Sequence, residues 1–388
     1  MLGKTNITTL SESGIVTEIE DYRWVQMQSE IYSDFVRAFY KNGYLSAITA
    51  DGQVAYTADG ETWQRVDLQY EGVKINDIDW DGKRFVLVGC YTDLSIAEDD
   101  TTGIAVTTTD FKVFSKLPMI AYGAYNGNPT YYNEYVFAVP MNGKYVVAAR
   151  YGKGLYGVTA EFAEGEMPGR SEMGMGTSFR LKYCTIARNS AGALAYIHKV
   201  SESQSGTSSE HRLYTIRDNE IKLLSNFSQL PNVRAITPLE CKDVLYFQNL
   251  LSNNAYALNK VTGSGEILTV TTGQDFAFTG AVYFSGCQLF INAHEMLVVH
   301  KGENLSDKTV EDLMEIAPEM TMQCIVRAFD QLYIFGGRGL ILRSSVETDN
   351  EEVIAVQTLS AKRALAEAKA YADEKCAALE ARIAALGG

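Results

Sequence analysis

The stretch "FVRAFYKNGYLSAIT", residues 35–49, indicates the fold most directly. It consists of two short runs rich in β-branched and aromatic residues, with Asn42 and Gly43 between them. Asn-Gly suits a two-residue hairpin turn because both turn positions take a positive φ. The stretch therefore predicts two antiparallel strands joined by a tight turn.

The same pattern recurs from about residue 34 to residue 350. "NVRAITPLECKDVLYF", from Asn232, and "CIVRAFDQLYIFGG", from Cys324, repeat its Val-Arg-Ala and its aromatic-rich second run. Such self-similarity at intervals of about 40 to 60 residues is typical of four-stranded propeller blades with their loops. The first strand of each repeat is marked by Val36, Ile75, Tyr135, Cys184, Val233, Gly280 and Ile325.

These markers predict an all-β fold, a β-propeller of about seven four-stranded blades over residues 34–350, with six or eight blades as alternatives. Residues 1–33 form an N-terminal segment that contains "DYRWVQMQ", residues 21–28, which resembles the last strand of a blade. Pairing of this strand with the final blade would close the ring and remove exposed sheet edges.

Residues 351–388 have a different composition, rich in Ala, Glu, Lys, Arg and Leu, with no glycine before Gly387. Apolar residues at heptad spacing predict a C-terminal α-helical coiled coil. We expect this helix to self-associate, a trimer being one option, because a lone helix is marginal in water. The alternative is a helix folded back on its own propeller. The expected oligomerisation residues are Leu365, Ala372, Cys376, Leu379, Ile383 and Leu386.

The composition excludes several classes of function. A formal net charge of −14 argues against binding to nucleic acid or to anionic membranes, which need clustered Lys and Arg. No apolar run is long enough to insert into a membrane, and no signal peptide is expected at the N-terminus. The six cysteines and four histidines have no metal-ligand spacing, so we expect neither a metal nor a cofactor.

The segment "TADGETW", residues 57–63, resembles the Asp-box, also called the BNR repeat, of sialidase-like and related propellers. In that family the box is a structural turn between the outer two strands of a blade. The resemblance implies that Asp59 accepts hydrogen bonds from backbone N–H groups, that Gly60 takes a positive φ and that Trp63 packs between sheets.

A second segment, "AVTTTDFKVFSKL", is similar to the first but more degenerate. Asp110 corresponds to Asp59 and Phe114 to Trp63, whereas Phe111 replaces the glycine. The short form of the box also looks like repeats of phage tail proteins. The resemblance therefore implies a propeller fold and a structural role for Asp110 and Phe114.

The segment "AYGAYNGNPTYYNEYVF", residues 121–137, is a candidate binding region. Exposed tyrosine rings suit contacts with sugars or protein surfaces, since they combine a flat apolar face with a hydroxyl group. The candidate binding residues are Tyr122, Tyr125, Tyr131 and Tyr132. The alternative is that these rings pack between blades, as we expect for Tyr135.

No catalytic constellation is evident in the sequence. It has no Gly-x-Ser-x-Gly elbow, phosphate loop or dinucleotide fingerprint, and the acidic residues are too many to pick out a glycosidase pair. We therefore expect no enzymatic activity. The alternative is a glycan-cleaving propeller, such as a sialidase-like enzyme or a depolymerase.

The whole architecture, an acidic propeller with polar insertions and an Ala-rich C-terminal helix, looks like that of bacteriophage tail or baseplate proteins. This resemblance implies a non-enzymatic component of the virion tail, a tail fibre or baseplate protein made in the host cytoplasm. Its partners would be other copies of itself, other tail proteins and a host-surface glycan. An intracellular scaffold is a further alternative.

Overall fold

Seven sheets of four antiparallel strands form, and in all but the last the order of the strands in space follows their order along the chain. We number these sheets as blades 1 to 7, starting at the sheet that contains residues 35–49. The Asn42–Gly43 turn adopts φ values of 50° and 77°, as an Asn-Gly hairpin requires. Because four strands alternate in direction, the first, inner strand of every blade starts on the same face of the molecule, which we call the entry face.

Blades 1 to 3 lie along the first half of the chain and end in outer strands of only two residues. Their strands are β4 (Phe35–Lys41), β5 (Tyr44–Thr49), β6 (Val54–Thr57) and β7 (Gln64–Arg65); β8 (Lys74–Trp80), β9 (Phe85–Thr92), β10 (Thr101–Thr108) and β11 (Ser115–Lys116); and β14 (Glu134–Met141), β15 (Lys144–Tyr151), β16 (Tyr156–Phe162) and β17 (Gly169–Arg170).

Blades 4 to 6 have longer outer strands. Their strands are β18 (Arg180–Asn189), β19 (Gly192–Ser203), β20 (Gly206–Arg217) and β21 (Glu220–Asn226); β22 (Ile236–Cys241), β23 (Val244–Leu250), β24 (Tyr256–Val261) and β25 (Ile267–Gly273); and β26 (Gly280–Phe284), β27 (Cys287–Ile291), β28 (Glu295–Val299) and β29 (Lys308–Asp312).

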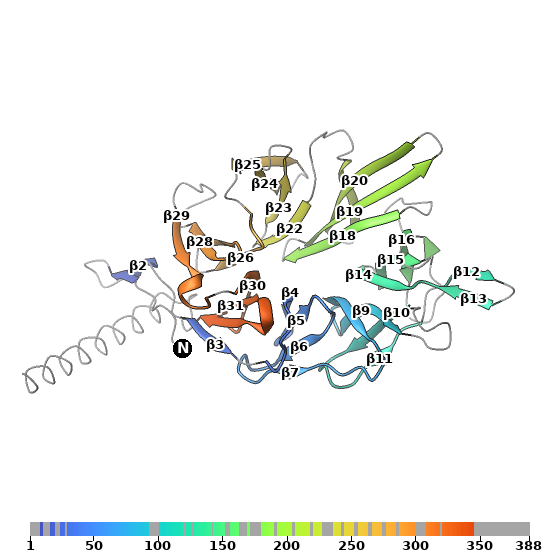
Figure 1. Cartoon of the computed structure of the whole chain (residues 1–388), viewed down its shortest axis with the longest axis horizontal. Helices are drawn as coiled ribbons and strands as arrows, with labels where there is room; N and C mark the ends of the chain where they lie inside the picture. The colour runs from blue at the N-terminus through green and yellow to red at the C-terminus, as the bar shows by residue number, and fades with distance from the viewer. Residues whose placement is uncertain are drawn as a thin grey trace, which may run out of the picture.

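Blade 7 is built from both ends of the propeller sequence. Its inner three strands are β30 (Met322–Ala328), β31 (Gln331–Gly336) and β32 (Ile341–Ser344), and its outer strand is β3 (Trp24–Met27). Strand β3 pairs with β32 so that Trp24 lies opposite Ser344. The segment "DYRWVQMQ" thus contains the strand that closes the ring (Figure 1).

Two hairpins lie outside the blades: β1 (Thr8–Leu10) with β2 (Val16–Ile19), and β12 (Ala121–Tyr125) with β13 (Asn128–Tyr131). This computed structural model describes residues 8–10, 16–19, 24–27 and 29–344, the last range with gaps at 93–100, 119–120, 126–127, 142, 152–155, 163–168, 171–179, 190–191, 204–205, 218–219, 227–235, 242–243, 252–254, 263–265, 274–276, 285–286, 300–307 and 319. The repeat marker Val233 is therefore not described.

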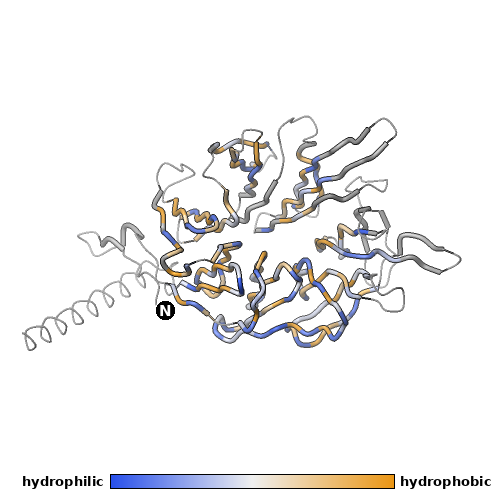
Figure 2. The backbone as a smooth tube through the Cα atoms, in the orientation of Figure 1, coloured by the Kyte–Doolittle hydropathy of each residue, from blue (hydrophilic) through white to orange (hydrophobic). Residues whose placement is uncertain are grey.

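The core is divided among the contacts between blades rather than gathered in one place. Seven clusters of buried hydrophobic residues each join two neighbouring blades, and together they connect all the blades in a circle. The cluster between blades 7 and 1 contains Phe35 and Trp63 from one side and Phe335 from the other. Figure 2 shows hydrophobic residues along the strands and hydrophilic ones at the turns of blades 1 and 2.

The predicted fold class is wrong in its helical part. Among the described residues the only helical elements are two 3-10 turns, Leu313–Glu315 and Gly337–Gly339, and no α-helix occurs. The described residues are all-β, so for them a propeller followed by a coiled coil is corrected to a propeller without a helical domain. The segment that carries the heptad pattern, with Leu365, Ala372, Cys376, Leu379, Ile383 and Leu386, lies outside the described residues.

Candidate functional site

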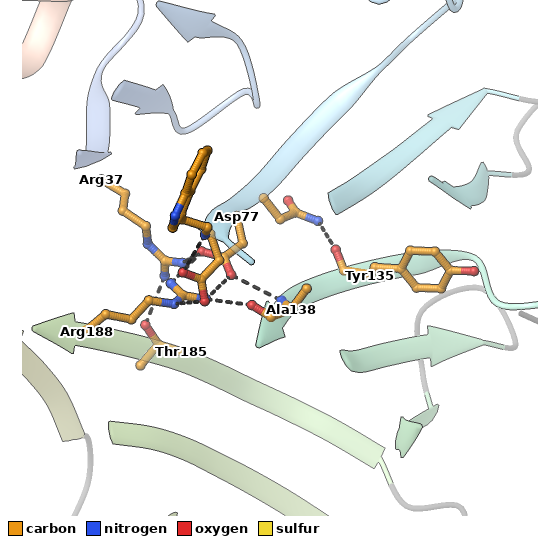
Figure 3. A network of polar contacts seen from close by, with 9 residues as sticks. Arg37, Asp77, Tyr135, Ala138, Thr185 and Arg188 are labelled. Carbon is orange, nitrogen blue, oxygen red and sulfur yellow. Dashed lines mark hydrogen bonds and ion pairs between the residues drawn. The ribbon is translucent and has the colours of Figure 1, made fainter. Parts of the chain in front are cut away.

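The inner strands of blades 1 to 4 meet near the centre of the ring in one polar network (Figures 1 and 3). Blades 1, 2 and 4 contribute charged side chains to it, and blade 3 contributes the backbone N–H and carbonyl of Ala138. Arg37 comes from β4, Asp77 and Asp79 from β8, and Arg188 from β18. Asp77 and Asp79 are two residues apart on one strand, so their side chains emerge on the same side of it. The network is the largest group of charged residues with mutual contacts in the described part of the chain.

Asp77 lies at the centre of this network and its side chain is fully buried. One oxygen, Oδ1, accepts hydrogen bonds from Arg37 Nη1 at 2.6 Å and from Arg188 Nη1 at 3.0 Å. The other, Oδ2, accepts from Arg188 Nη2 at 2.5 Å and from the backbone N–H of Ala138 at 3.2 Å. Four donors from three other blades therefore saturate this carboxylate, which offsets the large free-energy penalty of burying a charge.

Arg188 is the second hub, since its planar guanidinium bonds to two carboxylates and one carbonyl. Besides the two bonds to Asp77, its Nε donates to Asp79 Oδ2 at 2.7 Å and its Nη2 to the carbonyl of Ala138 at 2.8 Å. Arg37 also donates to the Thr185 hydroxyl at 3.2 Å. This fork geometry is a property of arginine that lysine could not reproduce.

Asp79 is a carboxyl group of the network with a raised pKa. Burial raises its pKa to about 6, the ion pair with Arg188 lowers it, and the nearby charge of Asp77 raises it. A carboxyl group with a raised pKa could act as a general acid if a substrate reached it. Here its oxygens accept hydrogen bonds from Arg188 and from the Trp80 N–H, at 2.7 and 2.8 Å.

The network can neutralise itself without a ligand, because two guanidinium groups face two carboxylates. Its evident physical effect is to fasten blade 2 to blades 1, 3 and 4 at the ring centre. None of these residues was singled out in the sequence. The available signal was the pair of acids, Asp77 and Asp79, at alternate positions of the strand "INDIDW".

Two buried thiols near this region are poor nucleophiles. Burial raises the pKa of Cys90 to about 11 and that of Cys184 to about 12. Because the thiolate is the reactive form, both groups are protonated and unreactive at neutral pH. Among the described residues no group of three or more His, Cys, Asp or Glu side chains is placed to hold a metal ion.

The turn between β6 and β7 has the hydrogen bonds expected from its sequence. Asp59 Oδ1 accepts from the backbone N–H groups of Glu61 and Thr62 at 2.8 and 2.7 Å, and Gly60 has a φ of 75°. Trp63 is buried and meets Phe335 of blade 7 edge-to-face at 5.7 Å. Through these contacts the turn packs blade 1 against blade 7.

The turn between β10 and β11 repeats this arrangement one blade further on. Asp110 Oδ1 accepts from the N–H groups of Lys112 and Val113 at 2.9 and 3.1 Å. Phe111 takes the place of the glycine with a φ of 59°, and its buried ring stacks on Tyr56 of blade 1 at 5.0 Å. Phe114 packs partly buried against the cluster between blades 1 and 2.

The candidate binding tyrosines are not brought together as a described exposed patch. Tyr132 is buried in the cluster between blades 2 and 3, so its assignment as a binding residue is wrong. Tyr135 lies in the same cluster, as expected for inter-blade packing. Tyr131 ends β13 and is half-buried, whereas the side chains of Tyr122 and Tyr125 on β12 lie outside the described set.

Comparison with known proteins identifies the fold only. The sequence matches no protein-family model and none of the curated proteins. The structure is similar to YCF48 bound to a D1 peptide, with 13% identity and a TM-score of 0.50 over 83% of this chain and 97% of that one. It is also similar to virginiamycin B lyase from Staphylococcus aureus, with 8% identity and a TM-score of 0.51 over 84% of this chain and 100% of that one.

Within the described residues, no helix has the length and hydropathy needed to cross a membrane.

Proposed function

We propose that this chain is a non-enzymatic binding and structural component of a bacteriophage or phage-like tail. In this role the ring contacts neighbouring tail proteins or a host-surface glycan and does not cleave what it binds. The proposal rests on the acidic composition, the short Asp-turn motifs and the way in which the charges at the ring centre are used.

The observation that carries the non-enzymatic part is the saturation of Asp77 by Arg37, Arg188 and the Ala138 N–H. A glycan-cleaving site needs two carboxylates that face the scissile bond with room for substrate or water between them. The two acids at the centre of this ring instead face guanidinium groups at hydrogen-bond distance. This arrangement favours a rigid ring over a hydrolytic centre.

The binding part is favoured by a protein of the same fold. YCF48 was solved with a D1 peptide, so a ring with this architecture can hold a peptide. By analogy of fold alone, a protein partner is the ligand class that we expect first for this chain.

Immunogold labelling of phage or phage-like particles from the source cells tests the proposed location. Antibodies against the purified full chain should label the tails of intact particles. Label restricted to cell extracts, with unlabelled particles, would overturn the tail assignment and favour an intracellular scaffold.

The enzymatic alternative needs a separate assay. The full chain is incubated with surface polysaccharides of the host. Cleavage is measured as new reducing ends, and binding is measured in parallel as polysaccharide retained on the immobilised chain. We expect no new reducing ends with wild type. Release of reducing ends by wild type that is lost in Asp79→Asn would contradict the proposal. It would identify Asp79 at the ring centre as a catalytic acid.

A further inference from the structure

The loop between β31 and β32 on the entry face of blade 7 presents an arginine from an unusual backbone conformation. Arg338 lies between Gly337 and Gly339 and has a φ of 54°, which L-residues with side chains adopt rarely. Its side chain is exposed. Backbone conformations of this kind persist only where the surrounding structure imposes them, and they occur often at functional sites.

The surroundings of Arg338 do impose this conformation. The Gly337 N–H donates to the Thr321 carbonyl at 2.8 Å, and the Gly339 N–H to the Ser33 carbonyl at 3.0 Å. The Arg338 N–H donates to Asp34 Oδ1 at 2.8 Å. A Cβ atom at Gly339 would clash with the carbonyl oxygen of Ile31, so the two segments are in direct contact. The loop is thus held by hydrogen bonds and close contacts to Thr321 and to residues 31–34.

The segment beside this loop exposes apolar side chains. Tyr32 is 83% exposed and Val36, at the start of inner strand β4, is 47% exposed, whereas Ile31 and Phe35 are buried. Gly339 is in close contact with the backbone of Ile31 and Tyr32. The exposed residues Tyr32 and Arg338 are therefore neighbours on the surface. Tyrosine and arginine are among the residue types enriched at the centres of protein interfaces.

We propose that Arg338, Tyr32 and Val36 form a docking site for a segment of a partner protein that carries one carboxylate beside apolar side chains. This inference rests on the proposed binding function and names the site and ligand chemistry for it. The guanidinium of Arg338 makes no ion pair with any described residue and can take a carboxylate in bidentate geometry. The exposed ring of Tyr32 and the side chain of Val36 pack against the apolar side chains of the partner segment that flank this carboxylate.

The acidic residues around Arg338 limit how much negative charge the partner segment can carry. The Asp34 carboxylate already accepts the Arg338 N–H, and Glu30 is exposed two residues before Tyr32. These two acids would repel a run of carboxylates, so a single carboxylate fits better than an acidic stretch. Val36 has no group that could bond to sugar hydroxyls, which favours a peptide over a glycan.

The test uses two immobilised libraries of extended peptides made from Leu, Val, Ile and Ser, with one central Glu in the first and Gln in the second. The full chain should bind the best Glu peptides in preference to their Gln partners. In Arg338→Gly and in Tyr32→Ala we expect binding to be about tenfold weaker. The matched control is Arg65→Gln, which removes an exposed arginine from the outer strand of blade 1 and should leave binding unchanged.

Arg338→Gly also separates binding from folding, because glycine takes a φ near 54° without steric strain. This variant should unfold at the wild-type temperature while losing the preference for Glu. Equal binding by Arg338→Gly and wild type, or no preference of wild type for Glu over Gln, would overturn the site. Either result leaves the tail assignment to the particle-labelling experiment, so the two proposals fail separately.

Discussion

Gly60 and Phe111 occupy the same position in two equivalent turns and share a positive φ, of 75° and 59°. They differ in what the neighbouring blade offers. At Gly60 the Tyr333 hydroxyl of blade 7 fills the space that a Cβ would need. At Phe111 the space between Tyr56 and Phe85 accepts a whole aromatic ring. The second turn therefore tolerates an unfavourable backbone conformation in exchange for a large buried ring.

Gly60→Ala should destabilise the protein by more than its backbone strain alone. We expect a loss of about 2–4 kcal/mol from the left-handed φ together with the clash against Tyr333. Gly43→Ala is the matched control, since Gly43 has a φ of 77° with nothing within 4 Å. It should lose only about 1–2 kcal/mol. Chemical denaturation of both variants measures the difference, and equal losses would contradict the clash.

Asp59→Ala should show a pH-dependent effect on stability. Hydrogen bonds from the Thr62 and Glu61 N–H groups lower the pKa of Asp59 to about 2 in the folded chain. A lowered folded pKa gives stability that is present above the unfolded pKa of about 4 and is lost as pH falls through 2. The variant should be less stable than wild type by about 1–2 kcal/mol at pH 7. Thermal unfolding from pH 7 to pH 2 should show this gap closing, and a constant gap would contradict the role of the charge.

At the scale of elements, the inner strands of blades 1 to 4 are connected by charges as well as by apolar packing. Strand β8 contributes Asp77 and Asp79, whereas the arginines come from β4 of blade 1 and β18 of blade 4. A buried network of this kind gives little net stability, but removal of one member leaves the others buried without compensation.

Asp77→Ala should therefore be strongly destabilising, by about 3–5 kcal/mol, because it leaves Arg37 and Arg188 facing each other. Asp330→Asn is the control: it breaks the ion pair with Arg327 at a site where the Asp330 side chain is 56% exposed, and asparagine tolerates the φ of 57° there. That change should cost about 0–1 kcal/mol. Urea denaturation distinguishes the two, and a small effect of Asp77→Ala would mean that the network does not hold the blades together.

The strands were predictable from the sequence to a greater extent than the network was. The marker residues Val36, Ile75, Tyr135, Cys184, Gly280 and Ile325 all lie in inner strands. Alternation and Asn-Gly turns are local properties, so a sequence can reveal them. The partners of a side chain are not local: the same Val-Arg-Ala places Arg37 on Asp77 in blade 1 but Arg327 on Asp330 in blade 7. The burial of Tyr132 was missed for the same reason.

At the scale of the whole molecule, ring closure depends on one short strand. Strand β3 supplies Trp24, which is fully buried in the cluster between blades 6 and 7. Without this strand, β32 would present an open edge at the point where the two ends of the ring meet.

Trp24→Ala should lower the unfolding free energy by about 3–5 kcal/mol through the cavity that it leaves. Gln26→Ala, on the same strand but with an exposed side chain, should change it by less than about 0.5 kcal/mol. Differential scanning calorimetry measures both. Comparable small effects of the two substitutions would contradict a closing role for the strand.

The pairing of Trp24 with Ser344 also fixes the order of events during synthesis. The ribosome releases β3 before every other strand of the seven blades, yet its partner β32 is the last of them to emerge. At about 5–20 residues per second this strand waits tens of seconds with its tryptophan unburied. The nascent chain must keep that segment from pairing with other exposed edges, and the finished ring can appear only after translation has passed residue 344.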